Sequence, residues 1–206
     1  MKNQIFTFLI LLIGVSCASN PFTGKKTMAF MPNSQLLPMA FAQYDEFLTE
    51  NKVLKGTSDA KMITRVGQRI SVAAERWLDA NNHQGYLKDY KWEYNLVDDE
   101  TVNAWCMPGG KIVFYTGILP IAENEAGVAA IMGHEVAHAL ANHGQQRMSA
   151  GMLQQAAAVG VVVATQEKSR SEQAMWMQAF AVGSSVGGML PFSRGHETEA
   201  DKIGLY

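Results

Sequence analysis

The stretch "GHEVAHALANHG" (residues 133–144) decides how we interpret this chain. It holds three of the five histidines and one glutamate within an otherwise apolar run. Its first part is an H-E-x-x-H pattern, and on an α-helix His134 and His138, at positions i and i+4, lie on one face. Both can therefore direct a ring nitrogen at one metal ion, while Glu135, rotated by about 100°, can reach a water on that ion. The pattern predicts a hydrolytic metal site rather than two surface histidines that flank a glutamate by chance.

His143 is not expected to join this metal site. The apolar residues between Val128 and Leu140 predict an amphipathic helix from about Asn124 to Ser149. On such a helix His143 is turned by about 140° from His138, so it can share the metal face only if the helix ends first. We predict a supporting or simple polar role for it.

A catalytic zinc ion usually has three protein ligands, so a third must come from elsewhere in the chain. The candidates are His196, Glu197, Glu199 and Asp201 in "SRGHETEADKIGLY" (193–206). On a helix, Glu197 and Asp201 share a face and Glu199 points away. We predict that Glu197 binds the ion and that Asp201 accepts the free N–H of a ligating histidine. The alternative for this segment is the charged, solvated start of a helix.

The remaining pattern predicts an α+β fold that is mostly helical, with a small antiparallel sheet or hairpin before the active-site helix. Helical spacing covers residues 34–51 and a second stretch that is capped by Ser58 or Asp59 and stops near "NNHQG" (81–85), and residues 90–98 alternate like a half-buried strand. Two β-rich runs, 101–107 and 111–117, flank Pro108-Gly109-Gly110 and predict a hairpin. Further helices are expected at 151–168, at 171–188 and from Ser193 onward. The apolar runs 156–165 and 179–190 are shorter than the ~20 residues of a membrane span, so packed helices are preferred.

The N-terminus is typical of an exported protein. Lys2 precedes an apolar run from Ile5 to Val15, and Ser16 and Cys17 follow. A small residue before a cysteine resembles a bacterial lipoprotein cleavage site, so we predict lipidation of Cys17. The alternative is ordinary signal cleavage that releases a free product. The expected organisation is a signal peptide at 1–17, a tether at 18–33 and one domain at 34–206.

Composition narrows the possible functions further. The formal net charge is −2, and Lys and Arg do not cluster, so nucleic-acid binding has no electrostatic support. Cys106 could be a nucleophile, but no paired base is evident, and a half-buried strand residue is preferred.

The quoted motifs resemble a known family. H-E-x-x-H with a downstream E-x-x-A-D ("ETEAD", 197–201) is similar to the gluzincin zinc metallopeptidases related to the type I CAAX prenyl protease. "NPFTGKK", "VNAWCMPGGKIVFYTGIL" and "NEAGVAAIMGHEVAHALANHG" resemble its bacterial periplasmic lipoprotein branch, which acts in envelope quality control.

The resemblance implies a zincin-like fold and one Zn²⁺ per chain. It implies that His134, His138 and Glu197 bind the ion and that Glu135 is catalytic. It also implies that an extended substrate contacts the backbone of Asn103 and Ala104.

The resemblance also implies a function, an endopeptidase for unfolded or misassembled envelope proteins. Its location would be the periplasmic face of the envelope, where a lipid anchor holds it to the outer rather than the inner membrane. Relatives of this kind continue past the E-x-x-A-D helix, so we expect a fragment or a truncated product whose own activity is open. Two alternatives stay open: a non-proteolytic, chaperone-like scaffold with a vestigial zinc site, and a cysteine-dependent enzyme. The sequence predicts no oligomeric state.

Overall fold

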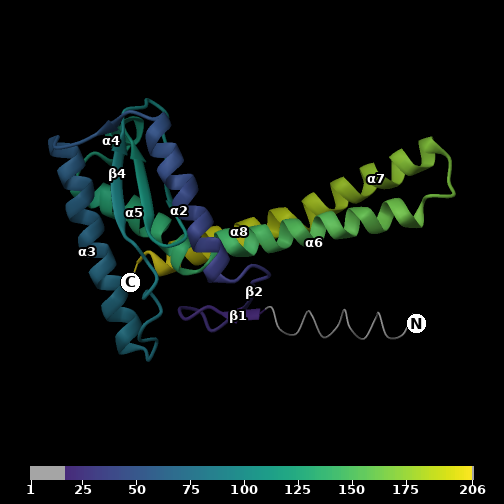
Figure 1. Ribbon diagram of the computed structural model, residues 1–206, viewed down its shortest axis with the longest axis horizontal. Helices are drawn as coiled ribbons and strands as arrows, with labels where there is room; N and C mark the ends of the chain where they lie inside the picture. The colour runs from purple at the N-terminus through teal and green to yellow at the C-terminus, as the bar shows by residue number, and fades with distance from the viewer. Residues whose placement is uncertain (1–16, 206) are drawn as a thin grey trace.

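The computed structural model describes residues 17–205; the predicted signal segment up to Ser16 lies outside the described residues. The chain forms two small sheets and a larger set of helices (Figure 1). In chain order the elements are β1 (Cys17–Ser19), β2 (Lys26–Met28), α2 (Asn33–Glu50), β3 (Val53–Leu54), α3 (Ser58–Ala80), β4 (Glu93–Val97), β5 (Ala104–Met107), β6 (Lys111–Tyr115), η1 (Thr116–Ile118), α4 (Leu119–Ala122), α5 (Glu125–Leu140), α6 (His143–Ala164), α7 (Arg170–Ser184), the π-helical turn η2 (Ser185–Met189) and α8 (Leu190–Ile203).

The larger sheet has the strand order β3-β4-β6-β5. The predicted hairpin is confirmed as β5 and β6, which pair antiparallel. The turn between them needs glycine, because Gly109 and Gly110 have φ of 87° and 83°, in the left-handed region. β4 pairs with β6 in parallel, so the sheet is mixed rather than purely antiparallel, and β5 forms its edge.

Alternation along the strands divides the core between the two faces of this sheet. Val97 and Val113 face α2, where they pack with Tyr44 in one apolar cluster. Their neighbours Leu96, Ile112 and Phe114 belong to the main cluster on the opposite face, with residues of α3 and α5. In Figure 1, α2 and α3 accordingly lie on opposite sides of the sheet. On this face α3 packs on β4 and α5 packs on β5, and the two helices also pack against each other.

The long helix expected at 124–149 is wrong, because the chain breaks after Leu140. Asn142 takes up the left-handed conformation, with φ of 57° and ψ of 33°. Asparagine is one of the few residues other than glycine that adopts this conformation readily. A new helix, α6, begins at His143 with a different axis. The break therefore changes the direction of every side chain from His143 onward.

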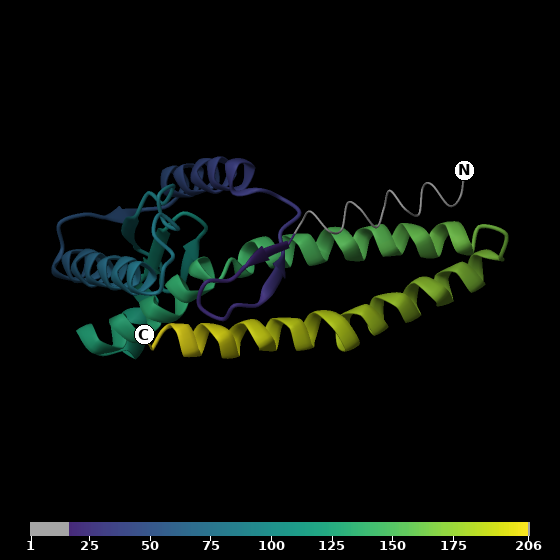
Figure 2. The ribbon, with the colours of Figure 1, turned by 90° about the horizontal axis from the view of Figure 1, so that it is seen from below.

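The helices after this break form an arm that projects from the body (Figures 1 and 2). α6 leads outward, and α7 returns through η2 into α8 and back to the body. The two helices predicted at 151–168 and 171–188 correspond to α6 and α7, but α6 begins earlier and the return path is nearly continuous. The antiparallel pair β1–β2 lies within the segment expected as a tether at 18–33, except for Cys17 at its start. The domain boundaries remain a prediction.

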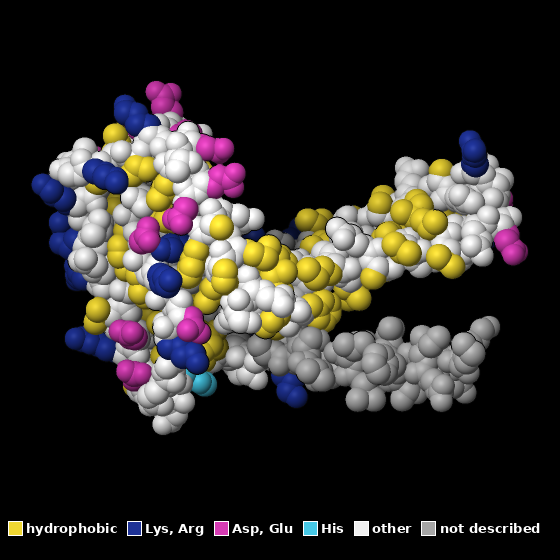
Figure 3. All heavy atoms as spheres, viewed as in Figure 1, with side chains coloured by type: hydrophobic (Ala, Val, Ile, Leu, Met, Phe, Trp, Pro, Cys, Tyr) yellow, Lys and Arg dark blue, Asp and Glu magenta, His cyan; other side chains and the backbone are white. Residues whose placement is uncertain are grey.

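The arm exposes apolar side chains without burying any over most of its length. The buried residues of α6 all lie at or before Ser149, and α7 and η2 have none. Figure 3 shows hydrophobic side chains along the arm. The large exposed ones are Met152, Leu153, Val159, Val162, Val163, Met175, Trp176, Val182, Val186 and Leu190. Within residues 17–205, none of the helices has both the length and the hydropathy of a membrane span.

Candidate metal centre

α5 presents the H-E-x-x-H residues on a helix with a well-formed start. The side chain of Asn124 accepts hydrogen bonds from the backbone N–H groups of Ala126 and Gly127, which satisfies the open first turn. About two and three turns after Gly127, His134 and His138 point the same way, and their Nε2 atoms lie 3.1 Å apart. The i, i+4 prediction for these side chains therefore matches the geometry.

α8 brings the two predicted acidic residues to these histidines. Glu197 Oε2 lies 3.3 Å from His134 Nε2 and 3.5 Å from His138 Nε2. Asp201, one turn later, places Oδ1 2.9 Å from His134 Nδ1, the nitrogen on the far side of that ring. Glu197 and Asp201 thus occupy the positions that the sequence predicted for a ligand and for its supporting carboxylate.

The donor atoms fit a zinc ion. Ligands bound at 2.0–2.1 Å in tetrahedral geometry lie about 3.3 Å from one another. The three separations here are 3.1, 3.3 and 3.5 Å. Within the described residues, His134, His138 and Glu197 are the group of histidines and acids that could hold a metal ion. Two imidazoles and one carboxylate match the donor preferences of zinc, and a fourth position stays free for water.

Glu135 lies beside this group in a cavity of about 320 Å³. Burial raises the pKa of Glu135 to about 7; the negative charge of Glu197 adds to the increase, and His134 and Arg147 oppose it. A carboxylate with its pKa near neutrality can both accept and return a proton. Glu135 therefore has the environment of a general base.

Arg147 is a residue of this cavity that the sequence reasoning missed. Its guanidinium Nη2 lies 3.2 Å from Glu197 Oε1, the oxygen that faces away from the histidines. It comes from α6, one turn after His143, and is about half exposed. The sequence did not indicate this role, because on one continuous helix Arg147 would not reach Glu197. This contact orients the Glu197 carboxylate and leaves Oε2 for the ion.

His143 and His196 are buried beneath the metal-binding group. Their rings stack at a centroid distance of 4.0 Å, with 10° between the planes. His143 Nδ1 lies 2.8 Å from His138 Nδ1, so the supporting role predicted for His143 is the one its position allows. Burial is the main cause that lowers the pKa of His143 to about 3 and that of His196 to about 4, so both rings are neutral near pH 7. Glu199 does point away from the metal-binding group, toward Asn20, whose amide donates to it over 2.9 Å.

The edge strand β5 borders the cavity, and its hydrogen-bond register decides which residues face outward. The Tyr115 N–H donates to the Asn103 carbonyl over 3.1 Å, so the pair Asn103–Tyr115 is hydrogen-bonded inside the sheet. Because hydrogen-bonded and open pairs alternate along an antiparallel ladder, Ala104 and Cys106 direct their backbone groups away from β6. The backbone groups of Ala104 are therefore available to hydrogen-bond an added strand, whereas the carbonyl of Asn103 already pairs with β6.

Cys106 does not have the environment of a nucleophile. Burial raises the pKa of its thiol far above the usual range, and the negative charge of Glu135 adds to this. A nucleophilic cysteine needs the opposite shift toward a thiolate. The alternative of a cysteine-dependent enzyme loses its support.

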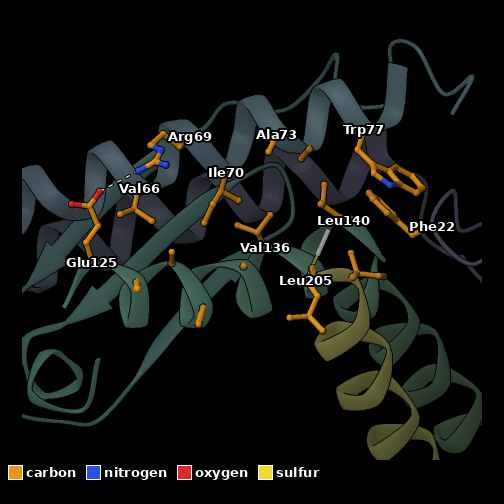
Figure 4. A pocket seen from close by; sticks show the side chains of 18 residues that line it. Phe22, Val66, Arg69, Ile70, Ala73, Trp77, Glu125, Val136, Leu140 and Leu205 are labelled. Carbon is orange, nitrogen blue, oxygen red and sulfur yellow. Dashed lines mark hydrogen bonds and ion pairs between the residues drawn. The ribbon is translucent and has the colours of Figure 1, made fainter. Parts of the chain in front are cut away.

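A larger cavity of about 690 Å³ lies on the other side of α5, between α3, α5 and the residues after α8 (Figure 4). The ion pair of Arg69 and Glu125 closes one end, and Phe22 stacks on Trp77 at the other. Its lining is mostly apolar, so it lacks the polar groups of the metal centre.

An H-E-x-x-H helix completed by a glutamate from a later helix is the arrangement of a metallopeptidase. The comparison with known families agrees with this class and narrows it. The chain belongs to peptidase family M48, whose family model matches residues 65–206.

Curated relatives include mitochondrial metalloendopeptidases and bacterial β-barrel assembly-enhancing proteases. The chain is 39% identical to the mitochondrial metalloendopeptidase OMA1 of Schizosaccharomyces pombe over 58% of this chain and 33% of that protein. It is 25% identical to human OMA1 over 90% of this chain and 35% of that protein. It is 26% identical to the β-barrel assembly-enhancing protease of Yersinia pestis over 55% of this chain and 24% of that protein. The chain thus spans about a third or less of the length of these relatives.

Proposed function

We propose that this chain is a zinc-dependent endopeptidase that hydrolyses peptide bonds in unfolded or misassembled proteins of the cell envelope. The observation that carries the proposal is the triangle of His134 Nε2, His138 Nε2 and Glu197 Oε2, with sides of 3.1–3.5 Å, beside a half-buried Glu135. Membership of family M48 supports it, as do the metalloendopeptidase names of several relatives.

His134, His138 and Glu197 would hold one Zn²⁺. When bound, zinc supplies a Lewis acid that makes water more acidic and polarises a carbonyl group. Glu135 would accept the proton of the attacking water and return it to the leaving amine, as its near-neutral pKa allows. Asp201 would fix the ring of His134 from behind, and Arg147 would orient Glu197.

The substrate would bind in an extended conformation along β5. An edge strand can take an added strand, whose backbone hydrogen bonds do not depend on sequence. Such recognition suits unfolded proteins. The outward-facing backbone groups of Ala104 and Cys106 would make these contacts, and the predicted contact at Asn103 would be limited to its side chain.

The location and the substrates rest on the N-terminal sequence and on a relative. Residues 1–17 support export and lipidation at Cys17, with the protein anchored at the periplasmic side of the outer membrane. The name of the Yersinia pestis relative refers to β-barrel assembly, which is consistent with envelope proteins as substrates. The proposed anchor places the membrane among the partners, along with protein substrates.

The substitution Glu135→Gln tests the proposed chemistry. It keeps the size of the side chain but removes the base, so we expect zinc content to stay near one per chain while degradation of an unfolded casein falls at least about 100-fold, in line with the usual contribution of a general base. Zinc content is measured by atomic spectrometry and degradation by release of labelled peptides.

Two outcomes of that experiment would count against the peptidase. Equal slow degradation by wild type and Glu135→Gln would favour a binding scaffold with a vestigial site. Loss of degradation in Cys106→Ala but not in Glu135→Gln would restore the cysteine-dependent alternative.

A further inference from the structure

The helix break at Asn142 places His143 directly behind a proposed metal ligand. His143 is the first residue of α6, and only 1% of its surface is exposed. Its Nδ1 atom lies 2.8 Å from Nδ1 of His138, a distance at which the two nitrogens share one hydrogen atom. One ring must therefore donate and the other accept.

The metal site decides the direction of this hydrogen bond. His138 turns its Nε2 toward His134 and Glu197, so this nitrogen has to be free of a proton to bind an ion. The proton of a neutral His138 then sits on Nδ1, which donates to His143 Nδ1. His143 in turn carries its own proton on Nε2.

That Nε2 atom faces a carboxylate that is largely shielded from solvent. Among the described residues it has no hydrogen-bond partner, and Glu199 Oε2 lies 3.8 Å away. The side chain of Glu199 is only 11% exposed and is held in place by Asn20 and Lys25. A buried N–H group without an acceptor costs free energy. A small movement of the His143 or Glu199 side chain would bring the Glu199 carboxylate within hydrogen-bond distance of this N–H group.

The stack with His196 holds the His143 ring in this orientation. His196 Nε2 lies 3.2 Å from Gln146 Oε1, and Gln146 donates to the Ala141 carbonyl at the helix break. The ring plane of His143 is thus fixed from the side, while its two nitrogens point at His138 and Glu199.

We propose that His143 is a positioning residue for the metal site: it accepts the Nδ1 proton of His138, and Glu199 accepts the Nε2 proton of His143. The proposal rests on the proposed zinc site and adds residues to it. Each histidine ligand then has its own support, His134 from Asp201 and His138 from the His143–Glu199 pair. Such supports keep the ligating tautomer and the ring orientation, and they raise the basicity of the ligand.

Zinc affinity of two matched variants tests this role. His143→Phe keeps an aromatic ring to stack on His196 but offers no acceptor, and His143→Asn places an oxygen near the position of Nδ1. We expect the dissociation constant for Zn²⁺, measured by competition with a chromophoric chelator, to rise about 10–100-fold in His143→Phe. We expect His143→Asn to stay within about fivefold of wild type, and Glu199→Gln to fall between the two.

The proton positions give a second readout that does not depend on activity. In the full-length zinc-loaded protein, ¹H–¹⁵N spectra of the imidazole rings should show His138 protonated on Nδ1 and His143 on Nε2. The melting temperature of the metal-free variants reports on packing separately.

The outcomes separate this inference from the proposed function. If wild type and His143→Phe bind zinc equally well, the positioning role alone is overturned. A His143 ring protonated on Nδ1 has the same consequence. Equal losses in His143→Phe and His143→Asn also overturn it, since they would reflect packing. A wild-type protein that binds no zinc overturns both.

Discussion

The two stacked imidazoles beneath the metal centre make the fold sensitive to acid. His143 and His196 have pKa values of about 3 and about 4 in the folded protein, lowered by burial and by the nearby positive charge of Arg147. In an unfolded chain a histidine titrates near 6.5. Between these values the unfolded chain binds more protons than the folded one, so stability is complete above pH ~6.5 and is lost as the pH falls.

We therefore predict that His143 and His196 destabilise the metal-free protein as the pH falls from 7.5 to 5, while Glu135, whose pKa is raised to about 7 in the folded protein, contributes with the opposite sign. Each buried histidine contributes a loss of about 1–2 kcal/mol at pH 5, because one pKa unit corresponds to about 1.4 kcal/mol. Urea unfolding with a chelator present measures it. His196→Gln should lose distinctly less on acidification than wild type, while His83→Gln, at an exposed loop position, should behave as wild type. If His196→Gln and wild type change by the same free energy of unfolding across this range, the prediction is contradicted.

The sequence predicted the residues of the metal centre that follow from helical angles. His134, Glu135 and His138 are one turn of one helix, and Glu197 and Asp201 are one turn of another, so their shared faces needed no tertiary information. His143 and Arg147 could not be placed in this way, because their directions depend on the left-handed conformation of Asn142. An asparagine with a glycine two residues later, as in "ANHG" (141–144), is a weak signal of such a break, and the apolar periodicity outweighed it.

At the scale of elements, the start of α5 depends on a close backbone approach. A Cβ atom on Gly127 would lie 1.9 Å from the carbonyl oxygen of Ala122, in the turn between α4 and α5. Glu123 in this turn has φ of 62°, which shows how tightly the chain reverses there. Only glycine at position 127 lets α5 begin where it does.

Gly127→Ala should therefore destabilise the protein by about 1–3 kcal/mol, even though alanine favours helices. Gly151→Ala is the matched control, since a Cβ there meets nothing within 4 Å; it should stabilise α6 by about 0.5–1 kcal/mol. Thermal unfolding of both variants measures the difference. If both substitutions stabilise the protein alike, the α4–α5 turn is not as tight as described.

The order of helices and strands was largely predictable, but the way the sheet is assembled was not. The hairpin at β5–β6 follows from Pro108-Gly109-Gly110 and local alternation. The parallel pairing of β4 with β6 joins segments with β5 between them, and no local pattern specifies that register. The register of this pairing depends on which face of β4 packs on α3 and which face packs on α2.

At the scale of the whole molecule, the protein has a packed body and a sparsely packed arm. The described core clusters draw on the sheet, on α2, α3 and α5, and on the end of α8. Residues 148–166 and 173–193 carry no charged side chain, yet Thr165 is the one buried residue among residues 150–189. The sequence showed these segments as apolar helices, but only the tertiary structure shows that they leave the body.

This difference predicts two levels of local stability. Amide hydrogens of residues 150–189 should exchange with solvent at least ~100-fold faster than those of β6 and α5, because opening the arm exposes little apolar surface. Hydrogen exchange followed by mass spectrometry, at low protein concentration, measures both regions in one sample. Equal protection of arm and body would mean that another surface covers the arm.

The central claim is that α5 and α8 together hold one zinc ion. A crystal of the zinc-loaded protein, measured on both sides of the zinc absorption edge, tests it most directly. The account predicts a single anomalous peak about 2.0–2.2 Å from His134 Nε2, His138 Nε2 and a carboxylate oxygen of Glu197. A peak bound instead by His143, His196 or Glu199, or the absence of any peak between α5 and α8, would contradict it.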